Sequence, residues 1–551
     1  MRSSLPPRRG AVPGWLARPL PLTAAVLVAA ISGFANAAAF PGLGWWPLIF
    51  VGTALMLWSL NGRRTWSALL VGFVGGFAFF GNHILWLTVY LGPVPWLALA
   101  GLESIFFALG CVLMALAWRH VPRVWSGAVV QLVGLPAVLA GLWVLREAIT
   151  SVWPYGGFSW GRLAFSQSDS SFAPLVAWLG ISGVSFVIAF LSAIALQAVR
   201  TGRARWTTRG MLAATAFLIA ALFPAWPVLT SGSIRIAAVQ GDSNSGLFAQ
   251  IQPGDSLDNH VQATVPILGK KVDVIVWPEN ASDIDPLRNE RAAQTLDFVS
   301  KEMDAPLVTG TITENAKGQT FNSLLLWKNG MRSVAQYDKI HPVPFAEYLP
   351  DRSFWYPLAP SLFDLVPRDY TFGTRSNVFD INGAMAGLAI CFDIVDDGLI
   401  HQMVDGGAEF ILAPTNNADF GHSDESVQQV AIARLRAIET GRSVVNASTV
   451  GVSAMFAPDG RTVAKLPTFT RGALVETIPL STTITPAMFA GRQIEWIVTG
   501  FGLAVLVVGM LLAPRRRSTT GPSATGPTAT ATGPSITRPP IIATRTGGNR
   551  G

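Results

Sequence analysis

Three polar side chains in the second half of the chain have the chemistry needed for acyl transfer. Glu279 follows the run Val-Asp-Val-Ile-Val-Trp-Pro, Lys339 opens a proline-rich loop, and Cys391 follows Ala-Gly-Leu-Ala-Ile. A cysteine thiol with an ordinary pKa of about 8.5 needs a base or a cation beside it to attack a carbonyl at neutral pH. We expect Glu279 to accept the thiol proton, and Lys339 to stabilise the thiolate and then the oxyanion of the tetrahedral intermediate.

The positions of these residues support this interpretation, although each side chain taken singly has a plainer one. Each lies beside a segment predicted as a strand, at the edge where open α/β sheets place their chemistry, and Cys391 precedes a turn as nucleophiles on sharp elbows do. Glu347 lies in the same proline-rich loop as Lys339. Holding two charged side chains in a stiff loop costs free energy unless they form an ion pair or take part in the chemistry. In the plainer interpretations Cys391 is an inert buried thiol, Glu279 is a carboxylate at a helix N-terminus, and Lys339 is a solvated loop lysine.

The segment that must position these residues, 231–494, is predicted to be an α/β domain. Short apolar runs bounded by turn residues are typical of strands, and they alternate here with helical stretches. The clearest helix covers 424–440. The predicted strands are Ile234–Gln240, Val272–Trp277, Pro306–Thr311, Ser323–Trp327, Ala386–Ile390, Glu409–Ala413 and Ser443–Ala447.

The rest of the chain has the composition of a membrane protein. Half of the residues are hydrophobic, only 13% are charged, and the mean hydropathy is +0.41. Soluble domains carry about a quarter of charged residues. The net charge of +7 comes largely from arginine clusters beside apolar runs, which argues against nucleic-acid binding.

Eight apolar stretches are long enough to cross a bilayer, which takes about 20 residues of helix. The first of them could instead be a signal peptide, because Arg8 and Arg9 precede it and it ends in Ala-Asn-Ala-Ala-Ala. Counting this stretch as a transmembrane span gives an orientation that agrees better with the distribution of arginines. The predicted spans are 20–38, 43–60, 67–91, 96–117, 127–147, 172–198, 211–230 and 495–513.

Arginine distribution orients these spans. With a cytoplasmic N-terminus every inside segment is basic, whereas the short outside segments 39–42 and 92–95 have no lysine or arginine. The inside segments hold Arg2, Arg8, Arg9, Arg63, Arg64, Arg119, Arg123, Arg200, Arg203, Arg205, Arg209, Arg515, Arg516 and Arg517. The predicted organisation is therefore a cytoplasmic N-terminus (1–19), a seven-span domain (20–230), an extracytoplasmic catalytic domain (231–494), a C-terminal transmembrane helix (495–513) and a disordered cytoplasmic tail (514–551).

A charged pair at the outer end of the fifth span allows two interpretations. Arg146 and Glu147 precede an aromatic loop, Trp153–Trp160. Charge at this depth is costly and often functional. The pair could be an interfacial ion pair in a packed loop, or the loop could line a path for lipid under the outer domain.

Only two cysteines are present, Cys111 in an apolar run and Cys391. This count excludes a disulfide framework. An unpaired thiol on the oxidising side of a membrane is consistent with a chemical role for Cys391.

The order of these motifs resembles a known signature. Trp277-Pro278-Glu279, then Tyr337-Asp338-Lys339 with Pro344-Phe345-Ala346-Glu347-Tyr348-Leu349-Pro350, then Cys391, is similar to the Glu-Lys-Cys signature of the nitrilase superfamily. With seven spans before it and one after it, the chain resembles the bacterial apolipoprotein N-acyltransferases over roughly 20–513. The stretch 433–442 also looks like the helix that follows the nucleophile in that family.

The resemblance implies a fold and a reaction. The fold is a polytopic α-helical membrane bundle of about eight spans with an α/β nitrilase-like four-layer αββα sandwich. Cys391 would take an acyl chain from a membrane phospholipid as a thioester, and the α-amine of the diacylglyceryl-cysteine of an apolipoprotein would then accept it. Glu347 matches a second, supporting glutamate. No cofactor or metal is expected, the location would be the bacterial cytoplasmic membrane, and we expect a monomer.

Two departures from the family pattern fall near the expected pocket. The family commonly has Tyr-Glu where this chain has Phe392-Asp393, and Asn-Asp-Ala-Trp-Phe-Gly where it has 416–421, with Asp419 replacing the aromatic residue. These changes leave the three catalytic candidates intact. They bear on the preference for acyl donor and acceptor.

Two other functions remain compatible with parts of the sequence. A membrane-tethered amidase of the nitrilase superfamily would use the same residues and let water complete the reaction, but it would not require the helical bundle. A catalytically silent membrane scaffold would not require the complete Glu279, Lys339 and Cys391 set.

Overall fold

The computed structural model describes residues 18–200, 206–243, 252–365 and 369–513, together with 537 and 540. The predicted disordered tail 514–551 and the basic segments around Arg8, Arg203 and Arg515 lie almost entirely outside these residues. In the first part of the chain the helices are α2 (Leu22–Ala38), α3 (Leu48–Ser59), α4 (Thr65–His83), α5 (Leu87–Leu91), α6 (Pro93–Val124), η1 (Val130–Gly134), α7 (Leu135–Thr150), η2 (Ser159–Gly161), η3 (Leu163–Gln167), α8 (Leu175–Arg200) and α9 (Trp206–Ala221). A last helix, α16 (Pro486–Leu512), joins this bundle from the far end of the sequence.

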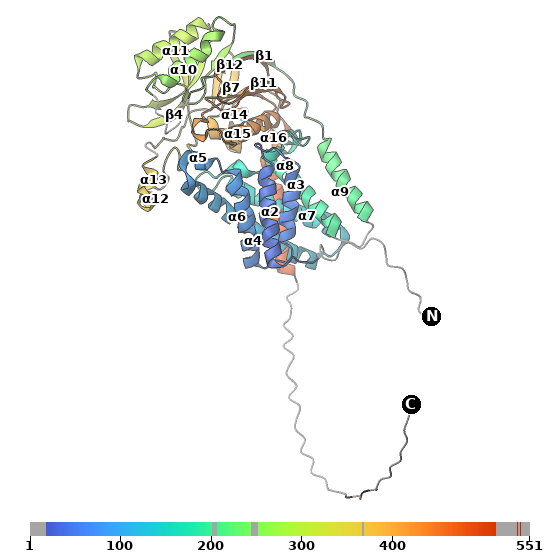
Figure 1. Ribbon diagram of the computed structural model, residues 1–551. Coiled ribbons are helices and arrows are strands. Elements are labelled where there is room, and N and C mark those ends of the chain that lie inside the picture. Colours follow the sequence, from blue (N-terminus) through green and yellow to red (C-terminus); the bar gives the residue numbers. More distant parts are fainter. Residues whose placement is uncertain are drawn as a thin grey trace, which may run out of the picture. The chain divides into compact units, whose positions relative to one another are not determined.

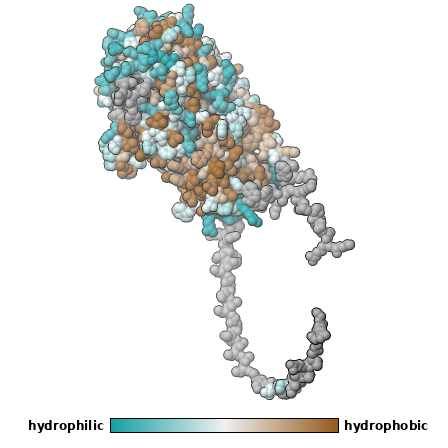
Figure 2. All heavy atoms as spheres, in the orientation of Figure 1, coloured by the Kyte–Doolittle hydropathy of each residue, from teal (hydrophilic) through white to brown (hydrophobic). Residues whose placement is uncertain are grey.

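The bundle has the dimensions of a membrane domain. In the described part of the chain, five helices are long and apolar enough to cross a bilayer: α4, α6, η1 with α7, α8 and α16. Three more apolar helices, α2, α3 and α9, are shorter. Figure 2 shows apolar residues gathered over the half of the molecule that these helices form, whereas most of the polar residues lie on the other half, among scattered apolar ones. The protein is therefore a membrane protein whose helix count agrees roughly with the prediction.

Several helix limits differ from the predicted spans. The single predicted span 67–91 is two helices, α4 and α5, because the chain turns between His83 and Leu87. Apolar residues continue through this turn, so hydropathy alone cannot reveal it. The last helix begins at Pro486, ahead of the predicted residue 495, and its first turns therefore lie among residues expected in the outer domain.

Glycines let the membrane helices approach closely. A Cβ added at Gly141 of α7 would lie 2.3 Å from the Val498 carbonyl oxygen of α16, and one added at Gly72 of α4 would lie 2.7 Å from Cys111 Cβ of α6. Small residues at such contacts are typical of helix pairs in lipid, where packing replaces the hydrophobic effect. Cys111 is thus a packing residue in the bundle.

The second part of the chain folds into two six-stranded sheets. The first has the order β12-β1-β2-β3-β4-β5 and the second β11-β10-β9-β8-β7-β6. The pairs β1–β2, β2–β3, β7–β8 and β8–β9 are parallel, and the pairs at the edges are antiparallel. The strands are β1 (Gly232–Gln240), β2 (Val274–Val276), β3 (Leu307–Glu314), β4 (Thr320–Lys328), β5 (Arg332–Asp338), β6 (Val378–Ile381), β7 (Ala384–Leu388), β8 (Phe410–Thr415), β9 (Ser443–Ser448), β10 (Ser453–Phe456), β11 (Thr462–Leu466) and β12 (Gly472–Leu480).

The sheets are the two inner layers of a four-layer sandwich. In β1, Ile236 and Ala238 belong to the core between the sheets, whereas Ala237 and Val239 belong to the core under the outer helices, as the two-residue period of a strand requires. Figure 1 shows α10 and α11 on the side of the sheets away from the bundle, and α14 and α15 between the sheets and the bundle. The helices of this domain are α10 (Asp255–Thr264), η4 (Val265–Ile267), α11 (Glu290–Glu302), α12 (Arg352–Trp355), η5 (Tyr356–Leu358), α13 (Pro360–Phe363), η6 (Cys391–Val395), α14 (Asp397–Asp405), η7 (Ala418–Phe420) and α15 (Glu425–Thr440).

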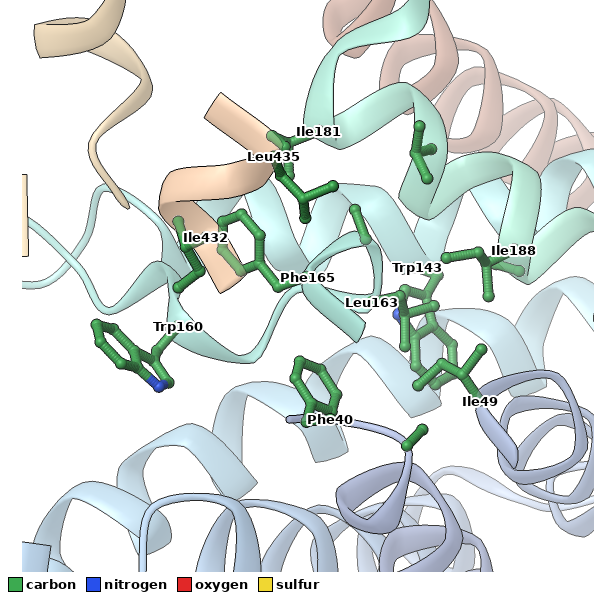
Figure 3. Close-up of a cluster of buried hydrophobic side chains, with 14 of the residues drawn as sticks. Phe40, Ile49, Trp143, Trp160, Leu163, Phe165, Ile181, Ile188, Ile432 and Leu435 are labelled. Carbon is green, nitrogen blue, oxygen red and sulfur yellow. The ribbon is translucent and has the colours of Figure 1, made fainter. Parts of the chain in front are cut away.

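One hydrophobic core joins the sandwich to the bundle. Ile432 and Leu435 of α15 pack in the same cluster as Phe165 and Ile181 of the membrane part, and Figure 3 shows these side chains pointing toward one another. Trp160, from the loop after α7, lies at the edge of the group. The layer of helices nearest the bundle is therefore fixed by apolar packing.

Candidate active site

Glu279 lies just beyond the end of β2 and is held there by close packing against β3. The Gly310 N–H donates to the Pro278 carbonyl oxygen at 3.1 Å, and a Cβ on Gly310 would lie 2.5 Å from the Glu279 Cα. Residue 310 must therefore be glycine for the strands to come this close. The buried carboxylate accepts one hydrogen bond on each oxygen, from the Asn322 side-chain amide at 2.7 Å and from the Asn416 backbone N–H at 2.8 Å.

Lys339 follows β5 and is only 1% exposed. Its backbone is fixed on both sides, since its N–H donates to the Asn322 carbonyl at 2.8 Å and its carbonyl accepts from the Gly373 N–H at 2.9 Å. Its Nζ lies 2.9 Å from Glu347 Oε2. Burial lowers the pKa of Lys339, but Glu347 and Glu279 raise it by more, so the pKa lies above its usual value and the side chain is an ammonium.

Asn322 links the two carboxylates of the site and was not singled out from the sequence. Its side-chain amide donates to Glu279 and, at 2.9 Å, to Glu347 Oε1. Glu347 also accepts from the Val343 N–H at 2.6 Å, which closes its own loop. The only signal for this role in the sequence was a pair of polar residues, Asn322 and Ser323, at the start of an otherwise apolar strand.

Cys391 begins η6 after β7 and has a φ of +52°. Non-glycine residues rarely adopt this left-handed conformation, and it recurs where a sharp turn presents a nucleophile. The residue is partly exposed. The turn expected from the sequence is therefore present, and it is a tight one.

The electrostatics connect Cys391 to the other candidates. Burial and the charge of Glu279 raise the pKa of the thiol well above its usual value, whereas Lys339 and a hydrogen bond with Thr415 lower it. Burial also raises the pKa of Glu279, with Lys339 opposing the shift. A thiol in this state needs a base in the reacting step. Glu279, Glu347 and Lys339 are joined through Asn322 and an ion pair. Cys391 interacts electrostatically with Glu279 and Lys339, while the catalytic roles of these residues stay a prediction.

Asp393, one of the departures from the family pattern, holds the turn of the nucleophile. Its Oδ2 accepts hydrogen bonds from the Tyr337 hydroxyl and from the Ile390 N–H, both at 3.0 Å. Burial raises the pKa of Asp393 to about 7, although Lys339 opposes the shift. The shorter side chain still closes the turn.

Phe392, the other departure, contacts the aromatic loop after α7. Its ring stacks on Trp160 with centroids 5.9 Å apart and on Phe158 at 6.0 Å. The Trp160 indole N–H donates to Gln428 Oε1 of α15 at 2.7 Å. This loop therefore reaches the residue next to the nucleophile.

The charged pair in front of the loop is part of the packing. Arg146 Nη2 lies 3.3 Å from Glu147 Oε1, and both side chains are buried. The same oxygen accepts from the Trp143 indole N–H at 3.0 Å and the Leu163 N–H at 3.1 Å. The charged pair is thus an ion pair within the packing, as the first interpretation has it, and the second, a lipid path lined by the loop, stays a prediction.

A cavity of about 830 Å³ lies where the bundle meets the sandwich. Its apolar wall comes from α7, α8 and α16, including Leu145, Ile149 and Trp496, and its other wall includes Phe392 and Asp393. Sites for small ligands commonly have volumes of roughly 300–1,000 Å³. Within the described ranges, no set of three His, Cys, Asp or Glu side chains is grouped to hold a metal ion.

Comparisons with known proteins cover both parts of the chain. Residues 32–194 match the apolipoprotein N-acyltransferase N-terminal domain, and residues 235–485 match the carbon-nitrogen hydrolase family. The apolipoprotein N-acyltransferase of Mycolicibacterium smegmatis is 33% identical over 92% of this chain and 89% of its own length, and that of Photobacterium profundum is 25% identical over 89% and 95%. Among solved structures, a mutant of the Nesterenkonia AN1 amidase from the nitrilase superfamily is 18% identical over 46% of this chain and 94% of its own, with a TM-score of 0.36.

Proposed function

This chain belongs to the apolipoprotein N-acyltransferase family, and we propose that its acyl transfer runs through a thioester on Cys391. The observation that carries the proposal is the hydrogen-bonded set of Glu279, Asn322, Glu347 and Lys339 beside a nucleophile on a tight turn. Lipoproteins and phospholipids are the substrates that membership of this family implies. The residue roles below are our assignment.

The first half-reaction loads the enzyme. The Cys391 sulfur attacks an ester carbonyl of a phospholipid while its proton passes to Glu279. The Lys339 ammonium stabilises the oxyanion of the tetrahedral intermediate. When the carbon–oxygen bond breaks, the departing oxygen takes the proton from Glu279, which leaves a thioester and a lysophospholipid.

The second half-reaction passes the acyl chain to nitrogen. The α-amine of a diacylglyceryl-cysteine attacks the thioester, Glu279 accepts a proton from that amine, and Lys339 again faces the oxyanion. Breaking the carbon–sulfur bond releases the amide, and the proton on Glu279 returns to Cys391. Glu347 supports both steps, because its contact with Lys339 fixes the ammonium in place.

The position of the cavity favours lipid substrates for this site. Its apolar wall is made of helices from the membrane bundle, and its opposite wall carries the two residues that follow Cys391. The lining also includes the charged residues Arg492 and Glu495. Cys391 directly precedes Phe392 in the chain, so an acyl chain against the apolar wall would lie near the turn of the nucleophile. Keeping the acyl chain out of water matters, because each exposed CH₂ costs about 0.8 kcal/mol.

We place the sandwich from β1 to β12 on the extracytoplasmic side of the bacterial cytoplasmic membrane. The Arg119 guanidinium donates to the Arg63 carbonyl at 2.6 Å, so the basic ends of α6 and of the α3–α4 turn are together. The sandwich contacts the opposite end of α4, where the His83 carbonyl accepts from Gln428. By the positive-inside rule the arginine end is cytoplasmic. We propose that a monomer suffices, because one chain supplies every residue of the reaction.

Mass spectrometry of the full-length protein tests the proposal. Wild type and Cys391→Ala are incubated with vesicles of a defined phospholipid, and a diacylated lipopeptide is then added. We expect wild type alone to gain the mass of one acyl group at Cys391 and to pass it to the peptide amine.

The other outcomes are distinguishable. An acyl group that leaves only to water would replace N-acyl transfer with hydrolysis. If no acyl mass forms with any phospholipid tried, or if Cys391→Ala gains it equally, the thioester route is wrong.

A further inference from the structure

A second group of buried polar side chains lies behind the site, and the reaction above does not use it. We call it the Asn417 cluster: Asn417, Glu425, Gln429 and Ser448, each at most 2% exposed. The Asn417 amide donates to Glu425 Oε2 and to Gln429 Oε1, both at 2.7 Å, and the Ser448 hydroxyl donates to Asn417 Oδ1 at 2.5 Å. Buried polar groups are costly unless they are paired, so this arrangement is closely specified.

The cluster contacts the site at two points. Asn417 directly follows Asn416, whose N–H is the backbone donor to Glu279. Thr415 donates to Gln429 Oε1 at 3.1 Å and also forms the hydrogen bond that lowers the pKa of the Cys391 thiol. The strand end 415–417 therefore connects the cluster to both the base and the nucleophile.

The cluster packs closely against the backbone at Gly451. A Cβ on Gly451 would lie 2.3 Å from Asn417 Oδ1 and 2.7 Å from the Ser448 hydroxyl oxygen. Only glycine at 451 allows the cluster to close. The position of the Asn416 N–H is thus set by side chains that touch no substrate.

Glu425 is the one carboxyl in this cluster, and no ion pair to a lysine, arginine or histidine is found for it within the described residues. Lys339 contacts Glu347 instead. Burial raises the pKa of Glu425 to about 8, the hydrogen bond from Asn417 opposes this shift, and the charge of Glu279 adds to it. At neutral pH the side chain is therefore mainly a neutral carboxylic acid.

We propose that Glu425 is a positioning residue for the acyl transfer, which holds Asn417 and thereby the Asn416 N–H on Glu279, and whose negative charge, when it ionises, slows the reaction. This inference rests on the proposed roles of Glu279 and Cys391. A negative charge at Glu425 opposes both the ionised base and the thiolate, because it lies in the same buried region as each of them.

Few other ionisable groups share this environment. Glu279 faces Glu425 from beyond the end of β2, and Cys391 faces it from the turn after β7. Asp419 belongs to the loop that enters α15, and Asp424 is the N-cap residue of that helix. Asp424 is directed elsewhere, toward Gly42 of the membrane part.

The test compares Glu425→Gln with Glu425→Ala in the full-length protein, using phospholipid vesicles as donor. The rate of thioester formation on Cys391 is measured by mass spectrometry from about pH 6 to pH 9.5. In wild type we expect the rate to fall on the alkaline side with a midpoint near the pKa of Glu425, about 8. In Glu425→Gln this fall should be absent, because glutamine does not ionise, and the rate should stay near its pH 7 value through about pH 9.

Glu425→Ala should lose about tenfold or more in rate at pH 7, since it removes one of the two acceptors of the Asn417 amide, and Glu425→Gln should recover most of that loss. Glu476→Gln, the same change at an exposed position of β12, is the matched control and should keep the wild-type profile. If Glu425→Gln keeps the wild-type alkaline limb, or if Glu425→Ala reacts at the wild-type rate, the proposal is overturned.

A second readout does not depend on any acyl donor. Alkylation of Cys391 by iodoacetamide reports its thiolate, since Cys111 is fully buried and out of reach of the reagent. Glu425→Gln should shift the alkylation midpoint of Cys391 to lower pH, and Glu476→Gln should leave it unchanged. An unshifted midpoint would refute the charge effect, even in a protein that failed to form a thioester, so failure of the proposed function would be recognised separately.

Discussion

Two buried charge clusters in this molecule are built in different ways. In the catalytic cluster one ammonium, Lys339, lies among Glu279, Glu347 and the Cys391 thiol. In the junction cluster, formed by Arg162, Asp397, Arg436 and Glu439, two guanidiniums face two carboxylates at distances of 2.5 to 2.6 Å.

The junction cluster uses its charges to fix the backbone. Arg436 donates to the carbonyls of Ile394 and Val395, at 2.8 and 2.9 Å, which follow the nucleophile in η6. Arg162 also binds Ser182 of α8, so the cluster joins the bundle to the sandwich. The pKa of Asp397 falls well below its usual range, since the two guanidiniums overcome the effect of burial.

In the catalytic cluster the positive charge balances only part of the negative charge. Burial raises the pKa values of Glu279 and Cys391, and the cation of the cluster, Lys339, opposes these shifts without cancelling them. Buried charges that are each paired with an opposite charge are typical of structural sites, whereas a buried group with a raised pKa is a candidate for proton exchange. On this basis we expect the catalytic cluster to act in chemistry and the junction cluster to act as a scaffold.

The largest expected effect would come from removing the nucleophile. Cys391→Ala should reduce acyl transfer below detection, since no other residue of the site can form the thioester. Cys111→Ala is the matched control, because Cys111 is a buried packing residue of α6. Transfer to a lipopeptide, followed by mass spectrometry, checks both variants, and residual transfer by Cys391→Ala would contradict the assignment.

Removing the single cation of the catalytic cluster should come next. Lys339→Met should slow thioester formation by about 10² to 10³-fold, as the loss of one oxyanion stabiliser does in other enzymes. Lys465→Met, at an exposed position of β11, should react at the wild-type rate. Equal rates for the two variants would remove the proposed distinction between the clusters.

The junction cluster should respond in stability. Arg436→Met leaves the buried Glu439 without its guanidinium, whereas Asp397, whose side chain is 38% exposed, keeps Arg162, so the expected cost is about 3 kcal/mol. Arg434→Met, in the same helix but pairing with the exposed Asp169, should cost about 1 kcal/mol or less. Thermal unfolding in detergent measures both, and if Arg436→Met slowed the reaction at unchanged stability, the cluster would have to be counted as catalytic.

The smallest effect concerns an exposed pair and depends on pH. His341 Nδ1 lies 2.7 Å from Asp396 Oδ2, and this hydrogen bond raises the pKa of His341. Burial raises the pKa of Asp396. The hydrogen bonds from His341 and from a backbone N–H lower it by a larger amount, so the net shift of this pKa is downward. A raised histidine pKa stabilises the fold below its ordinary value of about 6.5 and ceases to do so as pH rises through the folded value.

His341→Gln should therefore destabilise the protein by no more than about 1 kcal/mol near pH 5.5, since the histidine is 56% exposed, and by almost nothing at pH 9. Unfolding midpoints at the two pH values provide the check. A loss that is larger at pH 9 would have the wrong sign for this pair.

Much of the fold follows from local patterns. The strands found from sequence include β2, β8 and β9, which are buried in the parallel centres of the sheets and appear as continuous apolar runs. The strands β5, β6, β10, β11 and β12 were missed. Four of them, β5, β6, β11 and β12, are the edge strands of the two sheets and include exposed positions, where the apolar signal is weak, and β10 is buried but only four residues long.

The sequence by itself determined the membrane bundle, the α/β domain and the chemical types of Glu279, Lys339, Glu347 and Cys391, because hydropathy, turn residues and motif order are local properties. Only the tertiary structure decided that Asn322 joins two carboxylates, that Glu425 lies behind the base, and that Phe392 stacks on Trp160. These relations join segments far apart in the chain. Their energies arise from burial and proximity, which exist only after both sheets and the bundle have come together.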